Sequence, residues 1–115
     1  MNISRLPNGI ELDLEGQDTL LLSNSLNEVC NGFRIRDFER VIGVTHDQIC
    51  SLLERFRKLG TDHNSKVALT DRELRALQGA LRGSLNELCE EEFSTRTGCD
   101  FTIGQEILRA FVSFH

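Results

Sequence analysis

The sequence predicts a mainly helical α+β fold built from two similar halves, and three observations support this. The motif SLNEVC begins at Ser25 and returns as SLNELC at Ser84, with one aliphatic exchange. Apolar residues around both copies recur with the helical period of about 3.6 residues. Each half also contains one short alternating segment typical of a strand. The repeat is predicted to span residues 10–60 and 66–114, joined by a linker at 61–65.

The two halves are predicted to share one core around a pseudo-twofold axis. Correspondence continues beyond the repeated motif, since Gly43 matches Gly98 and Phe56 matches Phe111. A half of about 50 residues is close to the size at which one hydrophobic core becomes marginal. Two self-complementary halves solve this problem by burying their apolar stripes against each other. We therefore expect a single domain over residues 1–115, with the order short strand, long helix, short helix, helix occurring twice.

The expected strands are short. Residues 1–9 are interpreted as a loosely ordered lead-in that ends in the turn signal Pro7-Asn8-Gly9. Residues 10–14 then alternate apolar and polar, which predicts a half-buried strand, and residues 66–69 are its counterpart. A two-stranded ribbon is marginal in water, so helices must pack on these strands.

A long helix follows each strand. The first is predicted from Asp18, a candidate N-cap, to Asn31, with Gly32 ending it. The second begins at a capping box formed by Thr70 and Glu73. The apolar stripe of the first helix contains Leu22, Leu26, Val29, Cys30 and Phe33, and that of the second contains Leu74, Leu77, Leu81, Leu85, Leu88 and Cys89. Cys30 and Cys89 are thus expected at equivalent core positions.

Shorter helices complete each half. We expect one near residues 35–42 and its counterpart near 91–95. A capping box at Thr45–Gln48 begins the last helix of the first half, which Gly60 ends. The last helix of the second half is expected to begin near Asp100 or Thr102.

The charge balance excludes one class of partner. A net charge of −5 opposes binding to nucleic acid, which depends on neutralising phosphates. No segment approaches the roughly 20 apolar residues of a membrane helix, and the N-terminus lacks the apolar run of a signal peptide. We therefore expect a cytoplasmic protein without membrane contact, in which the four cysteines are free thiols.

Two polar residues are repeated together with the core, Asn27-Glu28 and Asn86-Glu87. One interpretation is a pair of symmetry-related carboxylates, Glu28 and Glu87, that face a groove and bind a ligand or a basic partner. The other is structural: each Asn bonds the backbone of a neighbouring loop, and each Glu pairs with an Arg of the short helix. The structural interpretation is favoured, because Asn in a helix interior is normally kept for a hydrogen bond.

An acidic cluster has no counterpart in the first half. Glu90, Glu91 and Glu92 follow Glu87, where the first half has Asn31-Gly32. The cluster is either a solvated helix face or a surface for a basic protein partner. Together with Glu28, these glutamates are the candidate partner-binding residues.

Motifs for catalysis or metal binding are weak. His46 and Cys50 are four residues apart on one helix, but no CxxC or HxxxH companion accompanies them, so we expect a core thiol beside a surface histidine. Cys99 is the thiol best placed for acidification by a helix N-terminus, although a loop cysteine is the simpler interpretation. No nucleophile elbow or phosphate-binding loop is present. The sequence predicts no catalytic residue, no metal and no cofactor.

The pattern SLNEVCNGF followed by DFERVIGVTHDQICSLLERF resembles small uncharacterised bacterial proteins, in which a leucine-Asn-Glu motif precedes a phenylalanine and a glycine. This resemblance covers residues 10–114. The chain is also similar to bacterial toxin-immunity proteins in its small size and acidic charge. That similarity involves no shared motif, so it assigns a role to no residue.

These observations favour a non-enzymatic protein-binding module, and more narrowly an immunity or inhibitor protein that neutralises a basic bacterial toxin. One alternative is a small-ligand binder or enzyme with its site between the two halves. A second alternative is a homo-oligomeric structural protein. We expect a monomer or a homodimer.

Overall fold

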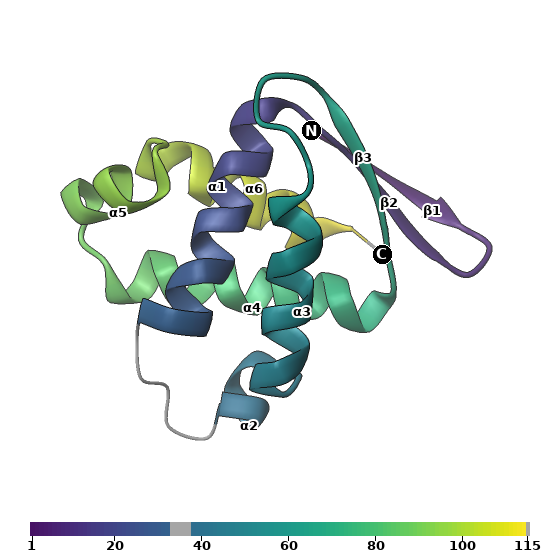
Figure 1. The fold of residues 1–115 in the computed structure, drawn as a ribbon, viewed down its shortest axis with the longest axis horizontal. Coiled ribbons are helices and arrows are strands. Elements are labelled where there is room, and N and C mark those ends of the chain that lie inside the picture. The colour runs from purple at the N-terminus through teal and green to yellow at the C-terminus, as the bar shows by residue number, and fades with distance from the viewer. Residues whose placement is uncertain (33–37, 115) are drawn as a thin grey trace.

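The computed structural model describes residues 1–32 and 38–114. Its sheet has three antiparallel strands in the order β1–β2–β3, and the helices lie to one side of it (Figure 1). The strands are β1 (Asn2–Leu6), β2 (Gly9–Leu14) and β3 (Ser65–Leu69). The prediction of a mainly helical α+β fold is confirmed.

The interpretation of the N-terminal residues as a loosely ordered lead-in is wrong. Residues 2–6 form the edge strand β1, which pairs with β2 in a hairpin that closes at Leu6 and Gly9. The turn itself was predicted correctly. Arg5 of this edge strand also contacts residues far away in sequence, because it pairs with Asp71 at 2.6 Å and lies 5.1 Å above the ring of Phe114. Neither contact is visible in the local sequence pattern.

The two predicted strands pair with each other. Ile10 lies opposite Leu69 and Leu12 opposite Val67, so the four side chains lie on one face of the sheet and all are buried. Gly9 permits this approach, since a Cβ there would come within 2.5 Å of the Leu69 carbonyl oxygen. The sheet therefore presents one apolar face to the helices.

The first long helix has an α-helical part followed by a π-helical turn. Helix α1 (Gly16–Asn27) leads directly into a π-helical turn, η1 (Glu28–Gly32). The N-cap of α1 is Glu15, and Asp18 is the third residue of this helix. Asp18 accepts a hydrogen bond from the Glu15 backbone N–H at 3.0 Å, so the prediction of Asp18 as N-cap is wrong.

Both predicted capping boxes are present. Thr45 is the N-cap of α3 (His46–Arg57), and Thr70 is the N-cap of α4 (Asp71–Glu87). The short helix α2 (Phe38–Ile42) precedes α3. The Thr70 hydroxyl accepts from the Glu73 N–H at 3.0 Å, and Glu73 accepts from the Thr70 N–H at 2.9 Å. Such reciprocal bonds satisfy backbone groups that a helix N-terminus leaves open.

The second half ends in two further helices, α5 (Glu90–Thr97) and α6 (Phe101–Ser113). Gly98 ends α5 in the left-handed region at φ 79°, which a glycine adopts without steric cost. Asp100 is the N-cap position of α6, as expected. Phe33 and the first part of the helix predicted at 35–42 lie outside the described residues.

The predicted element order occurs in both halves. Helix α1 packs against α3 as α4 packs against α6, and α1 and α4 also contact each other. These contacts do not test whether a pseudo-twofold axis relates the halves, so that axis stays a prediction. A common origin of the halves stays a prediction.

Nearly all of the two predicted apolar stripes is buried in one hydrophobic core. The buried members are Leu22, Leu26, Val29 and Cys30 of the first stripe and Leu74, Leu77, Leu81, Leu85 and Leu88 of the second. Among the stripe residues that the structure describes, Cys89 is the exception, and the prediction that it lies in the core is wrong. The first copy of the motif stays helical through Gly32, whereas the second leaves the helix at Leu88, where φ is −106° and ψ 137°. The two cysteines therefore follow different paths.

Leu26→Ala tests the core made by the repeated motif. Leu26 is 0% exposed and Leu85 9%, so we expect each alanine to lower the free energy of unfolding by about 2–5 kcal/mol, with the smaller loss at Leu85. Val112→Ala is the control, because its 49% exposed side chain predicts a change within about 0.5 kcal/mol. Urea denaturation measures all three, and a Leu26→Ala loss no larger than that of the control would contradict the shared core.

Candidate functional site

The glutamates of the repeated motif have different environments. Glu28 is buried in η1 and accepts a hydrogen bond from Arg96 Nη1 of α5 at 3.1 Å. Glu87, its counterpart, is exposed at the end of α4. The structural interpretation is thus confirmed for Glu28, which pairs with an Arg of a short helix. Glu28 and Glu87 do not form a symmetrical pair of carboxylates.

The repeated asparagines also differ. Asn27 Oδ1 accepts from Arg57 Nη2 at 2.9 Å and from Asn31 Nδ2 at 3.0 Å, whereas Asn86 is exposed. The expected bond to a neighbouring backbone is made instead by Asn24, whose Nδ2 donates to the Thr97 carbonyl at 3.0 Å. Asn27 therefore has a structural role with side-chain partners. Asn86 makes no equivalent bond within residues 1–32 and 38–114, although the surrounding motif is nearly identical.

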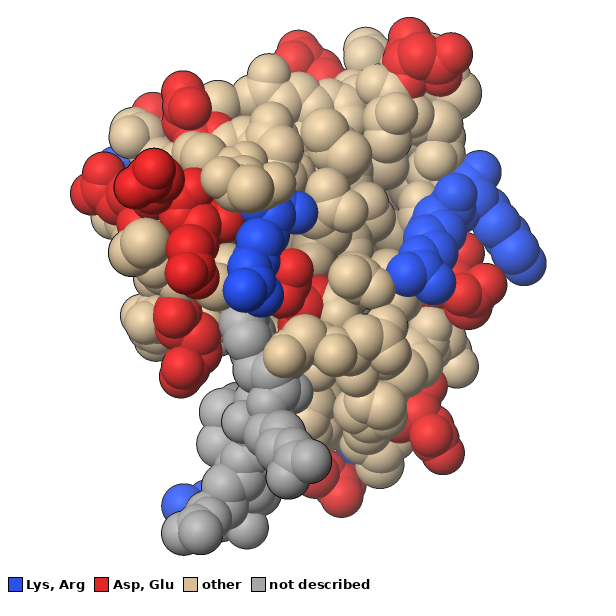
Figure 2. Space-filling model, turned by 60° about the vertical axis from the view of Figure 1, so that its left-hand side comes forward, with Lys and Arg blue, Asp and Glu red and all other residues tan. Residues whose placement is uncertain are grey.

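The predicted acidic cluster is exposed. We call Glu87, Glu90, Glu91 and Glu92 the α5 acidic face. Acidic side chains gather on this side of the molecule in Figure 2, which brings forward the end that carries α5. Three of them lie in the first turn of α5, where the helix dipole favours negative charge. Glu28 is not part of this exposed group.

A shallow hollow of about 400 Å³ lies beside these glutamates. Glu91, Glu92, Cys89 and Arg96 are among its lining residues. The guanidinium of Arg96 lies 3.1 Å from Glu28 and 4.0 Å from Glu92, so the basic group of this surface is already paired. The arrangement can accept an incoming cation, but it contains no nucleophile held by a general base.

Two of the four cysteines are joined, which corrects the expectation of free thiols. Cys30 of η1 and Cys50 of α3 form a disulfide, with their Cα atoms 5.9 Å apart. They are 20 residues apart in sequence, and the packing of η1 against α3 brings them into disulfide range. Cys89 and Cys99 are free.

His46 completes a cluster with these cysteines. Its Nε2 lies 2.7 Å from the Cys30 carbonyl oxygen, and its Nδ1 lies 3.7 Å from Cys50 Sγ. The ring of Phe38 packs edge-on against the imidazole, with centroids 5.3 Å apart. Sequence reasoning paired His46 with Cys50 but missed Cys30. No spacing signal links Cys30 to that pair, because a separate helix supplies it.

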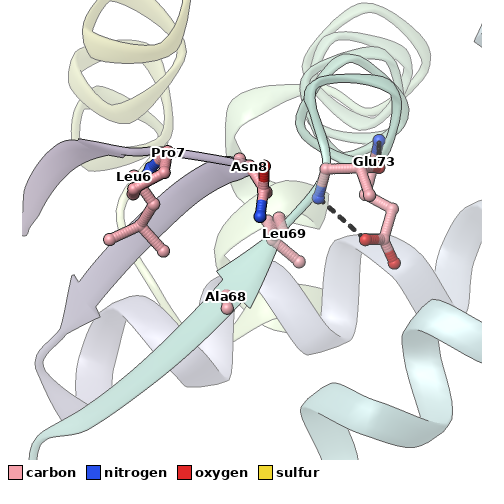
Figure 3. Close-up of a pocket in the computed structure, with 8 residues that line it drawn as sticks. Leu6, Pro7, Asn8, Ala68, Leu69 and Glu73 are labelled. Carbon is pink, nitrogen blue, oxygen red and sulfur yellow. Dashed lines mark hydrogen bonds between the residues drawn. The ribbon is translucent and has the colours of Figure 1, made fainter.

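A second hollow, of about 380 Å³, lies where the hairpin of the first half meets β3 and α4 of the second (Figure 3). Leu6, Pro7 and Leu69 supply much of its wall, and Glu73 is its ionisable residue. Both carboxylate oxygens of Glu73 are occupied, one by the Thr70 N–H and the other by Arg55. The hollow therefore offers apolar contact without a free acid or base, and neither Glu28 nor Glu87 lines it.

Comparisons with known proteins add no assignment. No protein-family model matches the chain, and neither a curated protein nor a solved structure matches it. Within residues 1–32 and 38–114, no helix has both the length and the apolar character needed to cross a bilayer.

Cys99 is not acidified by the helix that follows it, so the alternative of an activated thiol is wrong. The thiol is buried and donates to the Gln17 carbonyl at 3.5 Å. Burial raises the pKa of Cys99, and the negative charges of Asp18 and Asp100 raise it further. These effects disfavour the thiolate, which is the reactive form of cysteine.

We expect Cys99 to react with thiol reagents far more slowly than the exposed Cys89. Iodoacetamide labelling followed by peptide mass spectrometry measures both rates, and Cys89→Ser removes the fast phase. Between the ordinary thiol pKa and the raised pKa of Cys99, the folded chain keeps a proton that the unfolded chain loses. This group therefore makes the unfolding free energy fall as pH rises through that alkaline range. Equal labelling rates at neutral pH would contradict the burial effect.

Arg96→Ala tests the pair that joins η1 to α5. It leaves the Glu28 carboxylate buried without its cation, so we expect a loss of about 1–3 kcal/mol in the free energy of unfolding. Glu28→Gln in the Arg96→Ala background should recover part of this loss. Glu54→Gln is the control, because that glutamate forms an exposed pair and should change stability by less than about 0.5 kcal/mol. A null effect of Arg96→Ala in urea denaturation would contradict the pairing.

Proposed function

We propose that this protein is a non-enzymatic protein-binding module that contacts a basic partner through the α5 acidic face. The observation that carries the proposal is the concentration of exposed charge there. Residues 87–97 contain four glutamates and one arginine, and that arginine is paired with the buried Glu28. The surface therefore presents a net negative potential that its own residues leave largely uncompensated.

Such a face would speed association with a basic partner and help to set the orientation of that partner. Carboxylates grouped on one surface attract Lys and Arg side chains over a distance set by the ionic strength, and they disfavour acidic partners. Helix α5 is already folded and tied to η1 through Arg96 and Glu28. A preformed surface loses less conformational entropy on binding than a disordered segment does.

More narrowly, we propose an immunity or inhibitor protein that covers the basic active site of a bacterial toxin. Small size and acidic charge support this assignment. The α5 acidic face and the hollow beside it would together fit a basic group that protrudes from the toxin. A small-ligand binder is the second candidate. The hollow in Figure 3 favours it, and its largely apolar wall would take a small apolar molecule.

Co-purification from the source organism tests the proposal. We expect a stoichiometric basic protein that dissociates as salt rises, and the variant Glu90→Gln/Glu91→Gln/Glu92→Gln should weaken its binding at least about tenfold. The control, Asp47→Asn/Glu54→Gln/Glu106→Gln, removes the same charge from exposed positions on α3 and α6 and should bind as the wild type does.

Three outcomes would contradict this function. They are the absence of any stoichiometric partner, equal weakening by both triple variants, and light scattering that shows only a larger homo-oligomer.

The toxin assignment has its own test. Co-expression with the product of a neighbouring toxin gene should restore growth with the wild type and fail with the Glu90–Glu92 variant. A partner that is not toxic would reject the immunity role while leaving the binding function standing.

A further inference from the structure

We propose that Cys30, His46 and Cys50, once the disulfide is reduced, bind one thiophilic divalent cation, with zinc the preferred ion. Their ligand atoms all lie within 4.8 Å of one another. Two thiolates and an imidazole form a donor set that binds zinc in preference to magnesium or calcium, because those two ions prefer oxygen ligands. This site is separate from the α5 acidic face.

The distances already fit one edge of a zinc coordination tetrahedron. With Zn–S bonds of about 2.3 Å and Zn–N bonds of about 2.0–2.1 Å, bound sulfur and nitrogen lie about 3.6 Å apart. Cys50 Sγ and His46 Nδ1 are 3.7 Å apart. Reduction lets Cys30 Sγ move away from Cys50 to the sulfur–sulfur separation of about 3.8 Å that the same geometry requires.

The orientation of His46 supports the same conclusion. A carbonyl oxygen only accepts hydrogen bonds, so Nε2 must carry the proton that bonds to the Cys30 carbonyl at 2.7 Å. In the neutral ring, Nδ1 then keeps its lone pair and lies on the side of Cys50. Histidine ligands of metals are commonly fixed in this way, by donating the other ring N–H to a backbone carbonyl.

Two packed elements, η1 and α3, hold the three ligands. His46 and Cys50 lie one turn apart in α3, whose first turn is fixed by the Thr45–Gln48 capping box. Cys30 belongs to the buried part of η1. His46 is exposed, so the fourth coordination position can take water or a ligand from a partner.

Metal binding and the disulfide exclude each other, because both use the same two sulfurs. A dithiol reductant breaks the S–S bond by supplying two electrons and two protons, and becomes a disulfide itself. The cation then replaces the two thiol protons. In the reverse direction, a small-molecule disulfide takes two electrons from the thiolates, leaves as two thiols after protonation, and the cation is released.

Cobalt(II) titration of the full-length chain tests the site. The protein is reduced with a phosphine, freed of reductant without oxygen, and titrated with Co²⁺. We expect one Co²⁺ per chain, thiolate-to-cobalt charge-transfer absorption, tetrahedral d–d bands, and loss of both on adding one equivalent of Zn²⁺. The oxidised protein should give neither signal.

The variants separate this site from adventitious thiol binding. Cys50→Ser and His46→Ala should weaken Co²⁺ binding at least about tenfold, whereas Cys89→Ser should bind as the wild type does. His46→Ala retains both cysteines, so circular dichroism of its oxidised form checks that the fold survives. No tetrahedral spectrum from the reduced wild type, or unchanged affinity in Cys50→Ser and His46→Ala, would overturn the proposal and leave Cys30–Cys50 as a structural disulfide.

Discussion

The packing of α1 against α3 and α4 is the interaction on which the rest of the structure depends. Leu26 of α1 is fully buried and Leu85 of α4 nearly so, and both belong to the repeated motif. Burial of apolar surface at this junction is a driving force for folding, and the contact between α1 and α4 joins the two halves. The same junction gives the apolar face of the β2–β3 pair a cover and fixes η1 beside α3.

The turn η1 connects the two candidate sites. Its first residue, Glu28, pairs with Arg96 and thereby ties α5 to the core, while Cys30, two residues later, bonds to Cys50 of α3. The π-helical turn extends α1 beyond the point where the matching helix α4 ends. One local difference between two nearly identical motifs therefore places a carboxylate and a cysteine sulfur inside the molecule in one half. In the other half, Glu87 and Cys89 remain in solvent.

This divergence has a functional consequence under both proposals. The solvent-exposed copy contributes to the α5 acidic face, where charge is free to meet a partner. The buried copy contributes Cys30 to the cluster with His46 and Cys50, where a backbone carbonyl orients His46. The α5 acidic face and the Cys30–His46–Cys50 cluster therefore rest on the same hydrophobic core, although their chemistries differ.

The sequence by itself determined the long helices, the capping boxes of α3 and α4, and the buried stripes apart from Cys89, because a cap at Thr45 or Thr70 depends on residues within one turn and a stripe on helical period. It also located the hairpin turn and the acidic residues of α5. Only the tertiary structure decided that residues 2–6 form a strand, since that strand needs β2 as its pairing partner. Likewise, the union of Cys30 with Cys50 and His46, the raised pKa of Cys99 and the unequal roles of Glu28 and Glu87 depend on contacts between distant segments. Local spacing carries no information about such contacts, because they arise only when the helices pack.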